Sequence, residues 1–181
     1  MEGMYSPTRD PKIPAEGKSA AFAHWVSGYY AHSPSLLSSF PSVTLDELRK
    51  GIAEAPIRDP PPNRVPSVVN MSAEELAEIT DPAVITRSHP LYYNVDPALC
   101  KENLDAALLD ASTCPRLRVS LVWCDMSPPE TVMSTWYLAR QIQDLWPSNA
   151  RKIDVVRFEG ANHFPHWDEP DRTMNLLAKL I

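Results

Sequence analysis

Residues 118–123 have the sequence RVSLVW, and residues 153–158 have the sequence IDVVRF. Both are short apolar runs rich in β-branched residues, which predict buried strands. Residues 130–145, between the two runs, and residues 169–180, after the second run, carry apolar side chains at helical spacing. Strand, helix, strand and helix in this order predict a parallel βαβα unit. Residues 116–181 are therefore expected to form an α/β region.

The upstream part of the chain predicts helices without a convincing strand. Residues 18–32 and residues 97–109 repeat apolar side chains at helical spacing. Five prolines exclude regular helix and strand from residues 55–69, which predicts a loop or a polyproline connector. Residues 1–17 are dotted with proline and lack periodicity, so an extended or disordered lead-in is expected there.

Two further helix starts are marked by capping boxes. Thr44 stands three residues before Glu47, and Ser72 stands three residues before Glu75. In this motif the hydroxyl and the carboxylate satisfy backbone N–H groups that the first helical turn leaves unpaired. A short helix is therefore predicted after each box.

The predicted sheet is too small to account for a complete domain. Parallel sheets occur mostly with several strands side by side and with both faces covered. The chain also has only 5 glycines against 19 prolines, an unusual balance for an enclosed α/β sheet. Further strands are therefore expected from a segment that precedes this sequence or from a partner chain.

Composition narrows the class of protein. The chain has 181 residues and 44% hydrophobic content, enough for one core. A net charge of −6 without a long Lys or Arg run argues against nucleic-acid and anionic membrane partners, and favours a small molecule or another protein. No apolar stretch has the length of a membrane span or the setting of a signal peptide, so a cytoplasmic protein is expected. Cys100, Cys114 and Cys124 lack CxxC spacing and predict reduced, buried thiols.

Residues 160–170, with the sequence GANHFPHWDEP, lie between the second predicted strand and the last predicted helix. Loops at the carboxyl ends of parallel strands bind ligands in open α/β sheets, and an imidazole there can act as a general base. The segment resembles the histidine loop of the α/β-hydrolase family, and the resemblance implies that His163 is catalytic. Two alternatives stay open: a loop histidine that bonds the backbone, and a metal site formed by His163, His166 and Asp168.

Residues 118–128, with the sequence RVSLVWCDMSP, resemble the strand and turn that carry the acid of the same family. At the position of the family's aspartate this chain has Ser127, which cannot carry the charge. Asp125 lies two residues earlier on the same turn and is the candidate catalytic acid, with Glu130 as the alternative. Either carboxylate can also be an ordinary turn or helix-cap residue.

The family's nucleophile lies in a G-x-S-x-G elbow, and the glycines at 3, 17, 28, 51 and 160 leave no such motif. The resemblance implies an incomplete α/β fold, in which residues 18–115 are a helical cap or lid and residues 116–181 are the C-terminal βαβα part of a hydrolase sheet. Intact relatives would hydrolyse an ester, epoxide or related bond, whereas this chain is expected to be inactive alone. No cofactor is implied. The alternatives are a non-catalytic binding or interaction protein derived from the hydrolase fold, and one half of a split hydrolase.

Aromatic residues of the cap-like region are candidates for binding a small apolar substrate. Trp25 and Tyr29, with Phe164 of the histidine loop, are the predicted substrate-binding residues. Aromatic side chains at helical spacing also pack in protein cores, so this second role stays open for all of them. The other aromatic candidates are Phe22, Tyr30, Tyr92 and Tyr93. Self-association or binding of a partner chain is expected at the exposed edge of the sheet.

Overall fold

The two predicted strands pair in parallel. In the computed structural model, which describes residues 5–180 except 82, 85–86, 89–90 and 92–93, β1 (Val119–Cys124) lies beside β2 (Ile153–Phe158). Val119 is opposite Ile153 at one end, and Cys124 is opposite Phe158 at the other. Helix α7 (Pro129–Asp144) makes the crossover between the strands.

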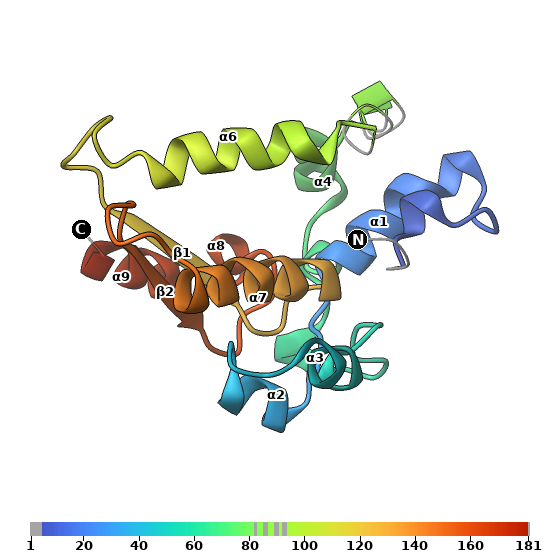
Figure 1. The fold of residues 1–181 in the computed structure, drawn as a ribbon. Coiled ribbons are helices and arrows are strands. Elements are labelled where there is room, and N and C mark those ends of the chain that lie inside the picture. Colours follow the sequence, from blue (N-terminus) through green and yellow to red (C-terminus); the bar gives the residue numbers. More distant parts are fainter. Residues whose placement is uncertain (1–4, 82, 85–86, 89–90, 92–93, 181) are drawn as a thin grey trace.

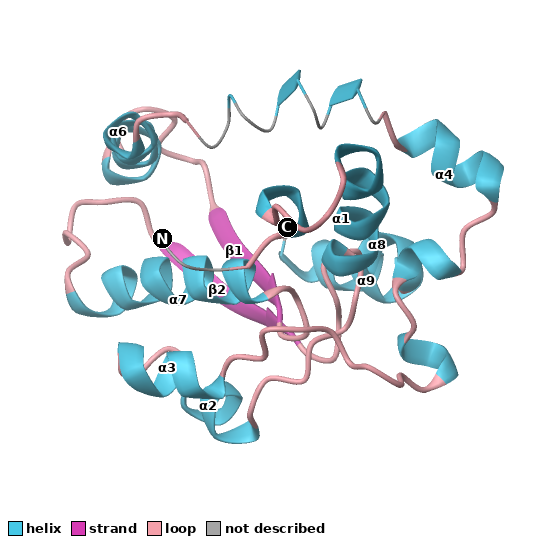
Figure 2. Cartoon of the chain, turned by 90° about the vertical axis from the view of Figure 1, so that its right-hand side faces the viewer, coloured by secondary structure: helices cyan, strands magenta, loops and turns pink. Residues whose placement is uncertain are grey.

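Helices lie on both sides of this small sheet. Figures 1 and 2 show α7 along one face, and α8 (Pro165–Asp168) and α9 (Pro170–Leu180) on the other. Helix α7 buries Val132 and Ala139, whereas α9 leaves Met174 and Leu177 exposed. The sheet is thus the middle of three thin layers.

The upstream half is helical. Both predicted capping boxes are confirmed, because each hydroxyl and each carboxylate bonds the backbone as predicted. The α-helices described there include α1 (Lys18–Val26), α2 (Pro34–Ser39), α3 (Leu45–Gly51), α4 (Ala73–Ile79) and α6 (Pro97–Leu109). Short 3-10 helices span Pro7–Arg9, Ala15–Gly17, Pro62–Arg64 and Ser67–Val69. None of the helices within the described ranges is both long and apolar enough to cross a membrane.

Helix α1 ends at Val26, six residues before the predicted end at residue 32. After Val26 the path of the backbone is set by contacts with distant parts of the chain. A Cβ atom on Gly28 would lie 2.6 Å from the Cβ of Pro56, so the chain passes close to the proline segment at this point. Beyond it the backbone N–H of Tyr30 donates to the carbonyl of Met126, at 3.0 Å. Tyr30 is fully buried at this contact, outside any helix.

The hydrophobic core joins α2 and α3 to α7. Leu36, Val43 and Leu48 are buried together, and Met133 and Trp136 of α7 pack against them. The indole N–H of Trp136 donates to the carbonyl of Val43, at 3.0 Å. In Figure 1 these two short helices lie directly below α7.

The expected fold class, a C-terminal βαβα part of an α/β-hydrolase sheet with a helical cap and incomplete as a domain, is wrong. The described residues form a mainly helical chain with a sheet of two strands, which makes this a small α/β protein. The prediction assumed that two parallel strands need further strands as neighbours. Here α7 packs on β1, α9 lies on the other side of the sheet, and loops from the upstream half bond the turns at the carboxyl ends of the strands.

The cysteines also differ from expectation. All three are free thiols, but Cys100 and Cys114 are exposed and Cys124 is half-buried. Cys100 lies on α6, none of whose residues is buried, which explains its exposure. The prediction of buried thiols is therefore wrong for two of the three.

Candidate functional site

Two turns at the carboxyl end of the sheet are bonded to one another. The backbone N–H of Asp125 donates to the carbonyl of Phe158 (3.4 Å), and that of Met126 donates to the carbonyl of Ala161 (3.0 Å). Gly160, between these acceptors, has a φ of +72°, a conformation that glycine adopts without a steric penalty. The turn after β1 and the histidine loop after β2 therefore form one unit.

Asp125, the candidate acid, is 2% exposed and is fully engaged within this unit. Arg157 donates to its Oδ2 through Nε (2.8 Å) and Nη2 (2.6 Å). The backbone N–H of Gly160 donates to its Oδ1, at 2.6 Å. Oδ1 thus holds the two turns together, and Oδ2 holds the turn after β1 to strand β2.

His163, the candidate base, lies on the same loop but accepts and donates no hydrogen bond within the described part of the chain. Its ring is partly open to solvent and meets Phe164 edge to face, with centroids 5.4 Å apart. Desolvation by the surrounding chain, and then the neighbouring His166, lower the pKa of His163. The structure does not join His163 to Asp125 by a hydrogen bond, and their catalytic roles stay predictions.

The alternative acid and the residue in the family's acid position have other partners. Glu130 forms an ion pair with Arg9, at 2.8 Å. Burial raises the pKa of Glu130, and Arg9 partly offsets this. Ser127 is buried, and its carbonyl accepts a hydrogen bond from Nε2 of His32 at 2.9 Å. Neither residue bonds the imidazole of His163.

Asp168 is the centre of a buried polar network. Its Oδ2 accepts hydrogen bonds from the hydroxyls of Tyr29 and Ser67 and from the amide of Asn162, each at 2.8 Å. Asn162 is fully buried and donates also to the carbonyl of Ser27, at 2.8 Å. Burial, and then the hydrogen bond to Asp168, raise the pKa of the Tyr29 hydroxyl. The network fixes the histidine loop against segments that come from far upstream.

A cavity of about 800 Å³ opens beside this network. The guanidinium carbon of Arg64 lies 5.5 Å from the centre of the Tyr29 ring, and its Nη1 donates to the carbonyl of Gly160 (3.3 Å) and to the sulfur of Met126. The cavity lies where the chain leaves β2, the end of a parallel sheet at which α/β proteins bind ligands. The side chains that line it include Tyr29, Arg64, Glu159, Trp167, Asp168 and Arg172.

Of the described aromatic residues that were predicted to bind substrate, Tyr29 lines this cavity, and Trp25 and Phe164 do not. Trp25 is 7% exposed and packs edge to face on Tyr30 in the interior. Phe164 is half-buried between the rings of His163 and His166. The candidates Tyr92 and Tyr93 lie outside the described residues.

Sequence reasoning missed Arg64, Ser67 and Asn162. Arg64 and Ser67 belong to the proline-rich segment, where no periodicity distinguishes them. Asn162 stands immediately before His163, and only its buried amide reveals its role. A buried asparagine in a loop signals a network, but burial in a loop cannot be inferred from one sequence.

The fold and site together define a small α/β protein with a polar cavity at the carboxyl end of a two-stranded parallel sheet. Across the described residues, no group of three or more His, Cys, Asp and Glu side chains is placed to hold a metal ion, which includes the alternative at His163, His166 and Asp168. Comparison with family models, curated proteins and solved structures finds no match to this chain.

Proposed function

We propose that this chain is a non-catalytic binding protein for a small molecule, and that the cavity beside the Asp168 network is its binding site. The cavity carries the proposal, since its volume of about 800 Å³ is within the range of small-molecule sites, about 300–1,000 Å³. Its wall has two aromatic rings, those of Tyr29 and Trp167, among mostly polar and charged side chains, which favours a polar ligand. The hydrogen bonds of Asp168 supply the rigidity that orients a ligand.

The geometry around Asp125 supports binding rather than catalysis. A triad acid must accept the N–H of the histidine, but the described partners of Asp125 are Arg157 and Gly160 and do not include His163. The sequence also offers no nucleophile elbow. A base alone contributes about 10²–10⁴-fold to a rate, too little for appreciable hydrolysis.

A second candidate function is hydrolysis in a complex with another chain, as one half of a split hydrolase. The position of His163 favours this second function, because the ring is exposed at the carboxyl end of β2. Among the described residues, neither ring nitrogen has a hydrogen-bond partner. The other chain would supply the nucleophile. Val155 of β2, 38% exposed, marks the side of the sheet at which self-association or a partner would act.

The proposal includes a cytoplasmic location and excludes nucleic acid and membranes as partners. The three free cysteines, two of them exposed, suit a compartment that keeps thiols reduced. The net charge of −6 disfavours anionic polymers and anionic lipid surfaces.

The binding proposal can be tested by nuclear magnetic resonance with a library of small polar fragments. Fragments that occupy the cavity should shift the amide of Gly160 and the indole N–H of Trp167, which line it. The amides of α6, a helix that contributes no residue to the cavity wall, serve as the internal control. A library that shifts no cavity resonance, or that shifts α6 equally, would contradict the proposal.

A further inference from the structure

Some of the charges on the cavity wall are already compensated within the protein. Arg172 donates from Nη1 to Oε2 of Glu169, at 2.7 Å, and from Nη2 to the carbonyl of Glu159. The Glu159 side chain is 82% exposed, and its Oε1 lies 4.0 Å from Nη2 of Arg157. These groups form the solvated rim and need no ligand.

Arg64 differs, because no carboxylate compensates its charge among the residues that the structure describes. Its Nη1 bonds one carbonyl and one sulfur, both neutral, and its guanidinium lies over the ring of Tyr29. The side chain is only half-exposed, so water screens it less than it screens a free surface arginine. A guanidinium has five donors in a planar fork that fits a carboxylate, and most of these donors remain unused.

Asp168 presents the opposite charge on the same wall. Its Oδ2 is saturated by three donors, whereas Oδ1 accepts no hydrogen bond from any described residue. Tyr29 lies between the two groups, since its ring is beneath Arg64 and its hydroxyl bonds Asp168. An ammonium group has three donors and no acceptor, and therefore suits the remaining carboxylate oxygen.

We infer that the ligand of this cavity is a zwitterion of the α-amino acid class, with its carboxylate on Arg64, its ammonium on Asp168 and an apolar side chain against Trp167. The inference rests on the proposed binding function and names its ligand. A simple anion would be repelled by Asp168, and a simple cation would be repelled by Arg64. A zwitterion satisfies both groups. Trp167 is 38% exposed on the cavity wall and offers an aromatic surface.

Three compounds with the same ring test the inference on the full chain: phenylalanine, phenethylamine and 3-phenylpropanoate. Titration followed by nuclear magnetic resonance should give phenylalanine an affinity at least about tenfold higher than that of either partner compound, because each of these lacks one charged contact. Equal or weaker binding of phenylalanine would overturn the inference. This comparison changes the ligand only, so it tests the Asp168 contact without disturbing the network that this side chain holds.

Arg64→Gln provides the matched change in the protein. It should weaken phenylalanine at least about tenfold and leave phenethylamine unchanged or tighter, since the repulsion is removed. Arg58→Gln, at an exposed arginine outside the cavity lining, is the control and should change neither affinity. Equal loss for all three compounds in Arg64→Gln would overturn the assignment of the carboxylate to Arg64.

The outcomes separate this inference from the binding proposal. If 3-phenylpropanoate binds as tightly as phenylalanine and shifts Gly160 and Trp167, the cavity binds ligands and the zwitterion is wrong. If none of the three compounds binds, the zwitterion is also wrong, and the fragment library decides independently whether the cavity is a binding site.

Discussion

Replacing Asp125 by asparagine should destabilise the chain, because Asp125 holds the turn after β1 to the histidine loop. The amide is nearly isosteric with the carboxylate, and its oxygen can still accept the N–H of Gly160, which now lies 2.6 Å from Oδ1. The amide NH₂ would then face Nε and Nη2 of Arg157, donor against donor. The change therefore removes two charge-assisted hydrogen bonds and leaves a cation without its partner.

The expected loss is about 2–3 kcal/mol in the free energy of unfolding. Removing one partner of a fully buried pair costs about 3–5 kcal/mol. The Arg157 side chain is 32% exposed, so water recovers part of that loss. With a urea dependence of about 2 kcal/mol per molar, the unfolding midpoint should fall by about 1–1.5 M. Tryptophan fluorescence measures it, since Trp123 of β1 lies two residues before Asp125 and is 3% exposed.

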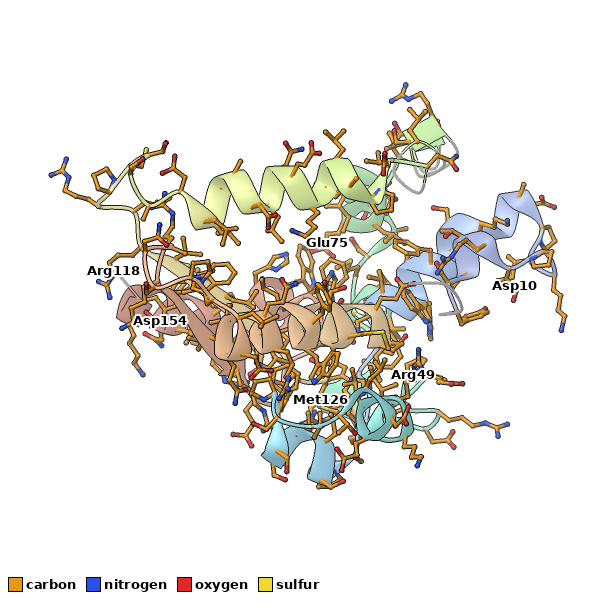
Figure 3. The ribbon with its side chains drawn as sticks, in the orientation of Figure 1. Asp10, Arg49, Glu75, Arg118, Met126 and Asp154 are labelled. Atoms are coloured by element: carbon orange, nitrogen blue, oxygen red, sulfur yellow. The ribbon has the colours of Figure 1, made fainter. Side chains whose placement is uncertain are left out.

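Asp154→Asn is the matched control. Asp154 lies on β2 with a side chain 53% exposed, at the end of the sheet remote from the Met126 turn (Figure 3). Its replacement should change the free energy of unfolding by no more than about 0.5 kcal/mol.

A second measurement distinguishes the two roles of Asp125. If it were the acid of His163, Asp125→Asn would lower the pKa of that imidazole by about one unit or more, because a neighbouring carboxylate stabilises the imidazolium. We expect a change below about 0.3 units in a titration by nuclear magnetic resonance. Unchanged stability together with a clear fall in the pKa of His163 would refute the structural role.

Three other predictions follow from the same contacts. Arg151, 5% exposed, donates to carbonyls at the end of α6 and in the loop after it. Arg151→Met should therefore lower the free energy of unfolding in urea by about 2–4 kcal/mol, and Arg151→Lys should recover less than half of that loss. An unchanged unfolding midpoint in Arg151→Met would contradict this prediction. Burial lowers the pKa of His32 from 6.5, so the unfolded chain takes up the proton first and the free energy of unfolding should fall as the pH drops from about 7 to about 5.5. His32→Gln should flatten that dependence, and an equally steep fall would point to other groups. The isolated chain should not hydrolyse short-chain aryl esters or styrene-type epoxides, and turnover that His163→Ala abolishes would count against non-catalytic binding.

The sequence determined most of the local structure. The strand at 153–158 and the helix at 97–109 lie where the apolar spacing predicted them, the strand at 119–124 lies one residue later than predicted, and both capping boxes start helices. These features depend on neighbours within a few residues, so one sequence contains the relevant interactions. The end of α1 depends instead on Pro56 and Met126, and periodicity therefore overestimated its length.

Tertiary structure alone decided the size of the sheet and the make-up of the site. Periodicity identifies a strand, but it does not say how many strands pair side by side, which is why the predicted fold class failed. Arg64, Ser67 and Asn162 carried no sequence signal, because their roles arise when the proline-rich segment meets the histidine loop. Asp125 was noticed for its place on the turn, yet its partner Arg157 lies on the other strand, opposite Trp123 in the register. A hydrogen bond between side chains that are distant in sequence becomes definite only when the backbone brings them within about 3 Å.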